Sequence, residues 1–413
     1  MKYIGMQIHI TNMCEFHCKH CYIDECKTDL SIDVVEKIIR EIKETSAFCV
    51  PSVNITGGDP LLHENWRDII QLFCSAGIGV AILGTPKTVN DETLETLRRL
   101  GVKRFQISLD GLQDKHDYIR GEGSFRKAID ALRLLNAYGF VPYVMFTVSD
   151  YNKDNFYALA DYLDKLQIPI ILGFDFCVSI GKAKKNHLSF DMRYINTFIE
   201  EYVRKREQFI SNKSQLVLAE KSHFICANKY IENSLTNSAK KTYSVISGCG
   251  AGWRNLCITE NGDVFPCRRM PIRIGNAKES NIFDLFLHAP QMKELRDRKN
   301  YGICANCSKY AFCRGCPAMI YGENNTIFRT ECPYYQFDGA PQACVDTENT
   351  FHNTSLSVMH DHIFNDQLLT AVFLRDKREK YELFMKDPKE WCKVHNISLT
   401  NEQLEFLVLS FYY

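Results

Sequence analysis

The sequence lacks an excess of charge of either sign. Its 413 residues carry 50 basic and 50 acidic side chains, so the formal net charge is zero. Binding to nucleic acid or to an anionic membrane surface depends on excess positive charge, so we expect neither as a partner. The sequence also lacks an apolar run long enough to span a bilayer. We expect no signal peptide, because the first residues lead straight into a predicted strand. We therefore expect a cytoplasmic protein.

Cysteine, by contrast, is abundant, with 18 in the chain. Without a secretion signal, this number indicates metal ligation in a reducing compartment instead of a disulfide framework. Cys14, Cys18 and Cys21 form a C-x3-C-x2-C loop, and no fourth cysteine is spaced to complete a tetrahedral site. Structural zinc sites and cubane iron–sulfur clusters both take four ligands. A cubane held by three thiolates therefore keeps one iron open for a small molecule.

This loop follows a strand-like run at residues 3–11 and resembles the signature of the radical S-adenosylmethionine (SAM) superfamily. The resemblance implies a 4Fe–4S cluster on the three cysteines, with the amino and carboxylate groups of SAM on the open iron. Reductive cleavage of SAM then gives a 5′-deoxyadenosyl radical that abstracts hydrogen from a substrate carbon. The alternative is a fortuitous thiol group or half of a zinc knuckle, because a motif alone is a hypothesis.

Strand and helix patterns alternate over the first part of the chain, which predicts an α/β fold with a parallel sheet covered by helices. The pattern has six strand–helix steps, and a closed barrel of eight repeats is not visible. By resemblance we expect a partial (β/α)6 radical SAM barrel, then a small cysteine-rich α+β domain and a helical C-terminal tail. The predicted strands are residues 3–11, 53–56, 79–83, 105–109, 141–148 and 170–176. The predicted domains are 1–184 (barrel), 185–247 (helical connector), 248–335 (cysteine-rich domain) and 345–413 (helical extension).

Gly57-Gly58-Asp59-Pro60 ends the second predicted strand. Ligands of open α/β sheets bind outside the carboxyl ends of the strands, and glycines there allow close approach of the backbone. The turn resembles the GGEP turn that holds the SAM amino group in radical SAM proteins, with Asp59 where Glu is usual. The alternative is an ordinary turn.

Ser108 ends the fourth predicted strand, and Arg120 lies twelve residues further on. In peptide and sulfatase maturases a serine and an arginine in this relation bind the SAM carboxylate, a task that suits a guanidinium fork. The alternative is a surface arginine and a capping serine. By resemblance His20 lies near the adenine of SAM, and Thr85, with Thr147, lines the SAM pocket.

A second set of cysteines resembles the SPASM extension, which holds two auxiliary 4Fe–4S clusters. Twelve residues separate Cys249 from Gly262, within the pattern, whereas two residues instead of three separate Cys313 from Cys316. By resemblance, the first auxiliary cluster takes Cys249, Cys257, Cys267 and Cys316, although the general pattern does not require Cys257. The second takes Cys304, Cys307, Cys313 and Cys332. The alternative is a pair of zinc sites, because C-x2-C pairs are common zinc ligands.

Auxiliary clusters can accept the electron that leaves when a substrate radical is oxidised, so we expect net oxidation or radical coupling. Sulfatase maturases carry an acidic residue after the cysteine that matches Cys267, but here Arg268 and Arg269 follow it. This departure counts against sulfatase maturation. Because enzymes that modify ribosomally made peptides dominate the SPASM family, the resemblance implies oxidative modification of a precursor peptide, with a flavodoxin- or ferredoxin-like reductant as second partner. The sequence assigns no catalytic acid, base or hydrogen donor. One alternative is an enzyme with the same clusters that acts on a sulfatase-type protein or on a small molecule. The other alternative is a zinc-stabilised interaction module without enzymatic activity.

The C-terminal extension carries two or three helical patterns and no metal-ligand spacing. Residues 386–404 faintly resemble leader peptides of the nitrile-hydratase-like precursor class, which suggests a leader-like or peptide-docking element. The alternative is a helical cap over the cluster domain, since apolar helical stripes usually bury against a core.

Overall fold

The computed structural model describes residues 2–23, 27–219, 249–306 and 313–332. The predicted ligand Cys307, residues 220–247 of the predicted connector and the C-terminal extension at 345–413 lie outside these ranges.

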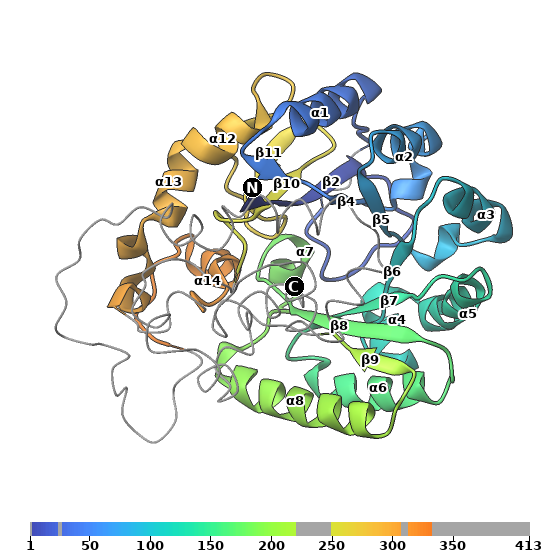
Figure 1. The fold of residues 1–413 in the computed structure, drawn as a ribbon. Coiled ribbons are helices and arrows are strands. Elements are labelled where there is room, and N and C mark those ends of the chain that lie inside the picture. Colours follow the sequence, from blue (N-terminus) through green and yellow to red (C-terminus); the bar gives the residue numbers. More distant parts are fainter. Residues whose placement is uncertain (1, 24–26, 220–248, 307–312, 333–413) are drawn as a thin grey trace, which may run out of the picture.

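A curled sheet of ten strands dominates the described part of the chain (Figure 1). All six predicted strands are present and pair in parallel in chain order, which confirms the partial barrel. They are β2 (Gly5–Thr11), β4 (Ser52–Gly57), β5 (Gly79–Leu83), β6 (Arg104–Ser108), β7 (Tyr143–Val148) and β8 (Ile170–Phe176). Their apolar runs fit strands that are covered on both faces. The short strands β1 (Lys2–Tyr3) and β3 (Phe48–Cys49) form a separate pair.

Two further strands extend the parallel sheet at its edges, and periodicity did not reveal them. β9 (Leu216–Leu218) pairs with β8, so the predicted helical connector also contributes a strand. β10 (Asn255–Ile258) pairs in parallel with β2 and continues the same sheet into the cysteine-rich segment. β11 (Asp263–Phe265) and β12 (Gly275–Asn276) follow as antiparallel strands. The predicted boundary at residue 248 is therefore not a break in the sheet.

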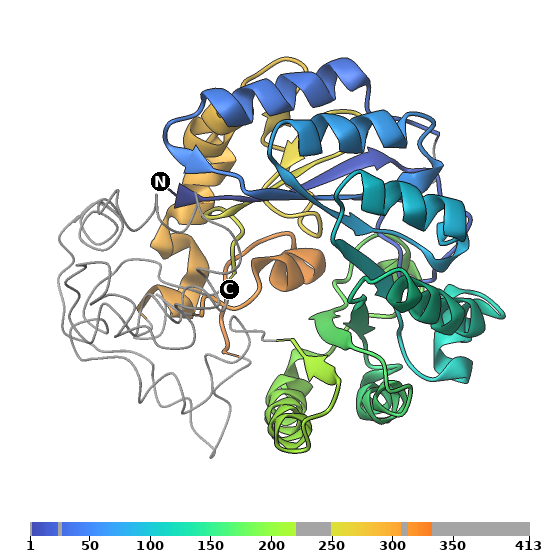
Figure 2. The same cartoon turned by 45° about the vertical axis from the view of Figure 1, so that its right-hand side comes forward.

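Helices surround the outside of the curled sheet, as Figures 1 and 2 show. They are α1 (Ile32–Glu44), α2 (Trp66–Ser75), α3 (Asp91–Arg99), α5 (Ser124–Ala137), α6 (Phe156–Asp164) and α8 (Ile195–Ser211). Shorter helices are α4 (Gln113–Arg120), α7 (Gly181–Lys185), α12 (Ile282–His288), α13 (Pro290–Arg296) and α14 (Pro317–Asn324). The 3-10 turns are η1 (Pro60–Leu62), η2 (Pro86–Thr88), η3 (Lys153–Asn155), η4 (Met192–Tyr194) and η5 (Arg298–Asn306).

Local sequence explains why these elements form where they do. In α1 the apolar residues recur at helical spacing, and all of the predicted face is buried: Val34, Val35, Ile38, Ile39 and Ile42. Ser31 occupies the N-cap position of α1, but its side chain makes no capping hydrogen bond. Asn90 does cap α3, because its side chain accepts from the backbone N–H of Thr93.

Helix α1 also joins the barrel to the cysteine-rich segment. Glu41 is buried, pairs with Lys37 at 2.5 Å and accepts a hydrogen bond from the backbone N–H of Ile282 at 2.8 Å. The ammonium of Lys37 also donates to the Ser280 carbonyl at 2.7 Å. These bonds hold the start of α12 against α1, far away in sequence.

We predict that Glu41→Ala lowers the free energy of unfolding by about 1–3 kcal/mol, because the buried Ile282 amide loses its acceptor. Chemical unfolding followed by circular dichroism measures this. Glu44→Ala, at an exposed position of the same helix, is the control and should change stability by less than about 0.5 kcal/mol. Equal effects of the two substitutions would show that the link between α1 and α12 contributes nothing.

Candidate active site

A cavity of about 550 Å³ opens at the carboxyl ends of the barrel strands. Its wall includes Gly57 and Gly58 after β4, Thr85 after β5, Ser108 at the end of β6 and Thr147 in β7. The carboxyl edge of an open parallel sheet is the usual ligand site of such folds, and this volume suits a ligand of nucleoside size.

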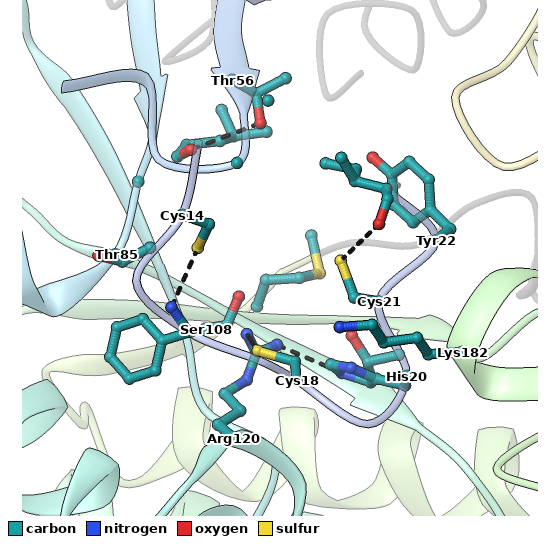
Figure 3. A pocket seen from close by; sticks show the side chains of 18 of the residues that line it. Cys14, Cys18, His20, Cys21, Tyr22, Thr56, Thr85, Ser108, Arg120 and Lys182 are labelled. Atoms are coloured by element: carbon teal, nitrogen blue, oxygen red, sulfur yellow. Dashed lines mark hydrogen bonds between the residues drawn. The ribbon is translucent and has the colours of Figure 1, made fainter. Parts of the chain in front are cut away.

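Cys14, Cys18 and Cys21 line one side of this cavity. Figure 3 shows their three side chains on one loop, with Arg120 and His20 beside Cys18. Cys18 is buried, whereas Cys14 and Cys21 are half-buried. Burial raises the pKa of Cys14 to about 11, so this thiol stays protonated near neutral pH unless a metal binds it. The predicted ligand loop thus lies in the cavity with its sulfurs accessible from inside.

The sulfurs of this loop do not converge on a single point. Among residues 2–23, 27–219, 249–306 and 313–332, no three cysteine, histidine or carboxylate side chains are close enough to share one metal ion. Such convergence is what a tetrahedral zinc site requires. A cubane needs less convergence, because each cysteine thiolate ligates its own iron.

The two glycines of the predicted SAM turn pack against the start of the cysteine loop. Gly57 has φ +132°, and a Cβ atom on it would lie 1.9 Å from the Thr11 carbonyl oxygen. A Cβ atom on Gly58 would lie 2.1 Å from the Met13 carbonyl oxygen. The Gly58 N–H donates to Thr11 at 2.9 Å and the Asp59 N–H donates to Met13 at 2.7 Å. Only glycine fits this approach, which holds the cluster loop against the end of β4.

Asp59 and Pro60 lie behind the cavity wall, unlike the other residues predicted to bind SAM. The Asp59 side chain is 1% exposed and accepts hydrogen bonds from the hydroxyls of Thr85 at 2.5 Å and Thr88 at 2.9 Å. Burial raises the pKa of this carboxyl, and the hydroxyl donors oppose that shift. Asp59 therefore orients Thr85, and a direct contact of Asp59 with a ligand in the cavity is not supported.

Arg120 lines the cavity as predicted, together with Ser108. Its Nε donates to Asp110 Oδ2 at 2.6 Å, and its Nη1 donates to Cys18 Sγ at 3.6 Å. Asp110 is fully buried. The guanidinium is therefore fixed beside the cysteine loop, unlike the mobile surface arginine of the alternative interpretation.

Asp110 is the functional residue that the sequence reasoning missed, although it lies two positions after Ser108. Its Oδ1 accepts from the Thr147 N–H at 2.8 Å, and its Oδ2 is 3.2 Å from His20 Nε2. Burial alone would raise the pKa of Asp110, but Arg120 and His20 together lower it well below its usual range. The carboxylate therefore stays ionised at neutral pH and can hold the guanidinium in place.

The two histidines near Asp110 have different roles. His116 is buried, and desolvation together with Arg120 lowers its pKa to about 4, so it is neutral and accepts from the Asp110 N–H through Nδ1 at 3.0 Å. His20 lines the cavity, and its Nε2 lies 3.4 Å from Arg120. Its predicted position near the adenine of SAM remains a prediction.

The predicted ligands of the first auxiliary cluster lie together. The side chains of Cys249 and Cys316 hydrogen-bond to each other, and Cys267 interacts electrostatically with both. Cys257, which the general pattern does not require, interacts with Cys267 and is 1% exposed. It reaches this group because β10 pairs with β11, which ends just before Cys267. Sheet pairing thus favours all four cysteines as one ligand set.

The predicted ligands of the second auxiliary cluster are only partly described. Cys304 lies in η5, Cys313 precedes α14 and Cys332 follows it. The Ile303 N–H donates to the Arg329 carbonyl at 3.0 Å, which joins the segment of Cys304 to the segment of Cys332. The assignment of these cysteines, with Cys307, remains a prediction.

Comparison with known sequences decides the family. The profile of the radical SAM superfamily matches residues 8–163, and that of the SPASM iron–sulfur cluster-binding domain matches residues 249–308. The chain therefore carries a radical SAM domain followed by a SPASM domain. Its cofactors are accordingly 4Fe–4S clusters and SAM, and the cavity lined by Cys14, Cys18 and Cys21 fits them. The radical SAM domain makes the protein an enzyme, not a zinc-stabilised interaction module.

Curated relatives include enzymes with different substrates. An AdoMet-dependent heme synthase of Methanosarcina barkeri is 24% identical over 338 residues, which cover 79% of this chain and 94% of the relative. A mycofactocin maturase of Mycobacterium ulcerans is 27% identical over 323 residues, or 74% of this chain and 80% of the relative. The sporulation killing factor maturation protein of Bacillus subtilis is 22% identical over 300 residues, or 72% and 68%.

Solved structures share the fold. SuiB of Streptococcus suis, bound to its precursor peptide SuiA, superposes with a TM-score of 0.64 at 18% identity, covering 81% of this chain and 76% of SuiB. The enzyme anSMEcpe with bound AdoMet superposes with a TM-score of 0.63 at 17% identity, covering 80% and 94%. In the described part of this radical SAM enzyme, no helix has the length and apolarity to cross a membrane.

We predict that anaerobically reconstituted enzyme holds about twelve irons per chain, as three cubanes require, and that Cys18→Ala holds about eight. The variant should also release no 5′-deoxyadenosine from SAM under dithionite. Iron analysis and chromatography measure these quantities. Cys74→Ala, in α2 away from the cavity, should match the unaltered enzyme. Undiminished iron in Cys18→Ala would contradict the assignment.

We further predict that Asp110→Asn weakens SAM binding at least tenfold, about 1.4 kcal/mol, because the Arg120 guanidinium loses the charge that fixes it. Anaerobic equilibrium binding measures the change. Asp114→Asn, an exposed position on the helix that carries Arg120, is the control and should bind SAM normally. Unchanged affinity in Asp110→Asn would mean that the buried pair does not position the arginine for SAM.

Proposed function

We propose that this radical SAM enzyme oxidatively modifies a ribosomally made precursor peptide, by forming a crosslink, a thioether or a related bond at an unreactive carbon. Bound SAM and its cluster supply the 5′-deoxyadenosyl radical that removes a hydrogen atom from the substrate. If the product is oxidised, one further electron must leave, and the auxiliary clusters provide a route for it.

The carrying observation is that the auxiliary ligands lie next to the SAM cavity. Arg268 and Arg269, which follow Cys267 directly, line the same cavity as the Cys14 loop. Tyr22 also lines it and interacts electrostatically with Cys21 on one side and with Cys257 and Cys267 on the other. A substrate in this cavity therefore lies between the two kinds of cluster site.

Charged groups on the cavity wall bear on substrate choice. Arg268 and Arg269 each lie 3.6 Å from Asp175 at the end of β8, and Arg269 donates to the Phe176 carbonyl at 2.8 Å. In sulfatase maturases an acidic residue takes the place of Arg268. In this chain the nearby carboxylate is that of Asp175, and it is paired with two arginines. This arrangement counts against sulfatase maturation. It suits a peptide with an acidic side chain near the reacting residue.

The proposal extends to location, partners and domains. An exposed iron and many free thiols require a reducing compartment, so we place the enzyme in the cytoplasm, with a flavodoxin- or ferredoxin-like protein as electron donor. Residues 1–184 hold SAM, residues 248–335 hold the auxiliary clusters and residues 185–247 connect them. Residues 345–413 form the C-terminal extension, whose two candidate roles are a cap over the cluster domain and docking of the peptide leader.

A small-molecule substrate is the second candidate, because a heme synthase is among the relatives at 24% identity. We predict that a short peptide encoded beside the gene, incubated anaerobically with enzyme, SAM and dithionite, loses about 2 Da per modification. The reason is that net oxidation removes two hydrogen atoms. Mass spectrometry measures the loss, and control reactions without SAM should show none. Consumption of a tetrapyrrole with the peptide unchanged would instead support the second candidate.

A further inference from the structure

Arg329 is a buried arginine in the cysteine-rich segment, and the SAM site does not use it. It lies three residues before Cys332, and its side chain is 2% exposed. A guanidinium group carries a positive charge, so a positive charge is buried here. Burial of an uncompensated charge is costly, which raises the question of what compensates it.

Two glycines allow the backbone to pack closely against this residue. Gly302 has φ +59°, and a Cβ atom there would lie 2.0 Å from the Arg329 carbonyl oxygen. Gly315 has φ +60°, and a Cβ atom there would lie 2.4 Å from Arg329 Nη2 and 2.6 Å from Cζ. The guanidinium therefore lies directly on the backbone of Gly315, where any other residue would displace it.

Protein groups accept hydrogen bonds from only part of this guanidinium group. Its Nη2 donates to the Cys316 carbonyl oxygen at 3.1 Å. Its Nε and Nη1 are buried and have no hydrogen-bond partner among the residues that the structure describes. Within the same residues no carboxylate lies within 4.0 Å of it, and Glu323, which interacts with it over a longer distance, is exposed.

The position of Arg329 relates these free donors to the auxiliary clusters. Gly315, on which the guanidinium lies, is flanked by Cys313 and Cys316, which are both buried. These two cysteines are predicted ligands of different clusters, and Cys316 lies with Cys249 and Cys267. A cubane with four thiolates carries net negative charge, and its sulfurs accept hydrogen bonds, so it can supply both missing partners.

We propose that Arg329 is an electrostatic partner of the auxiliary cluster for which Cys316 is a predicted ligand, and that it raises the reduction potential of this cluster. Reduction adds one electron, here from dithionite in a redox titration, and no proton is transferred. The added negative charge strengthens the attraction to the guanidinium, so the reduced state gains more than the oxidised state. The proposal rests on the auxiliary clusters alone and not on a peptide substrate. It assigns Arg329 a role in making the cluster a better acceptor for the substrate's electron.

Redox titration followed by electron paramagnetic resonance tests this in a Cys14→Ala/Cys18→Ala/Cys21→Ala background, where only auxiliary clusters remain. With Arg329→Gln, the equilibrium constant for one-electron reduction of one auxiliary cluster should fall at least tenfold, or 59 mV. Arg329→Lys, which keeps the charge, should recover most of this loss. Arg273→Gln removes an exposed charge in the same segment and should leave both potentials unchanged.

The remaining outcomes also decide the proposal. Unchanged potentials in Arg329→Gln with full iron content would overturn it. If Arg329→Gln fails to hold iron, Arg329→Lys decides: recovered iron would support a requirement for the charge. Iron lost from both variants would overturn the proposal, because packing of the side chain would then explain the effect. Failure of peptide modification would leave these potentials unaffected, so the two proposals are tested separately.

Discussion

The active site depends on the close approach of two chain segments at the end of neighbouring parallel strands. Thr11 and Met13, after β2, accept hydrogen bonds from Gly58 and Asp59, after β4, at 2.9 and 2.7 Å. The approach is so close that a side chain on either glycine would collide with backbone oxygen. It holds the loop of Cys14, Cys18 and Cys21 at the cavity wall. Because strands β2 and β4 pair in parallel register, their carboxyl ends, and hence the cluster loop and the cavity, lie at one edge.

A second layer of interactions places charge around that loop. The buried Asp110 holds Arg120 beside Cys18, and Asp59 holds the Thr85 hydroxyl at the cavity wall. In both pairs a buried carboxylate makes no contact with the cavity itself but fixes a group that does. On the opposite side, the cavity wall passes directly into the cysteine-rich segment at Arg268 and Arg269. The parallel pairing of β10 with β2 makes this continuity, because one sheet supports both cluster regions.

Much of the fold was predictable from local patterns. The strand at Gly79–Leu83 and the strand at Ile170–Phe176 begin and end where alternating and apolar runs predict, and Asn90 caps its helix as expected. The strands β9 and β10 were missed, because three or four residues carry too little periodicity and their pairing partners are distant in sequence. Asp110 and Arg329 were not recognised as functional residues, because nothing in the neighbouring sequence marks a charged residue as buried.

The sequence by itself determined the chemistry of this enzyme: the spacing of three cysteines on one loop, the eight later cysteines and the glycine turn indicate the cofactors. Tertiary structure decided how those motifs are arranged. It places Asp59 behind the cavity wall and Cys257 near Cys267. It also brings the SAM cavity and the predicted auxiliary ligands to one sheet. The physical reason is that ligand identity depends on the residue type and its near neighbours, whereas burial, charge compensation and the neighbourhood of two sites depend on which distant strands pair.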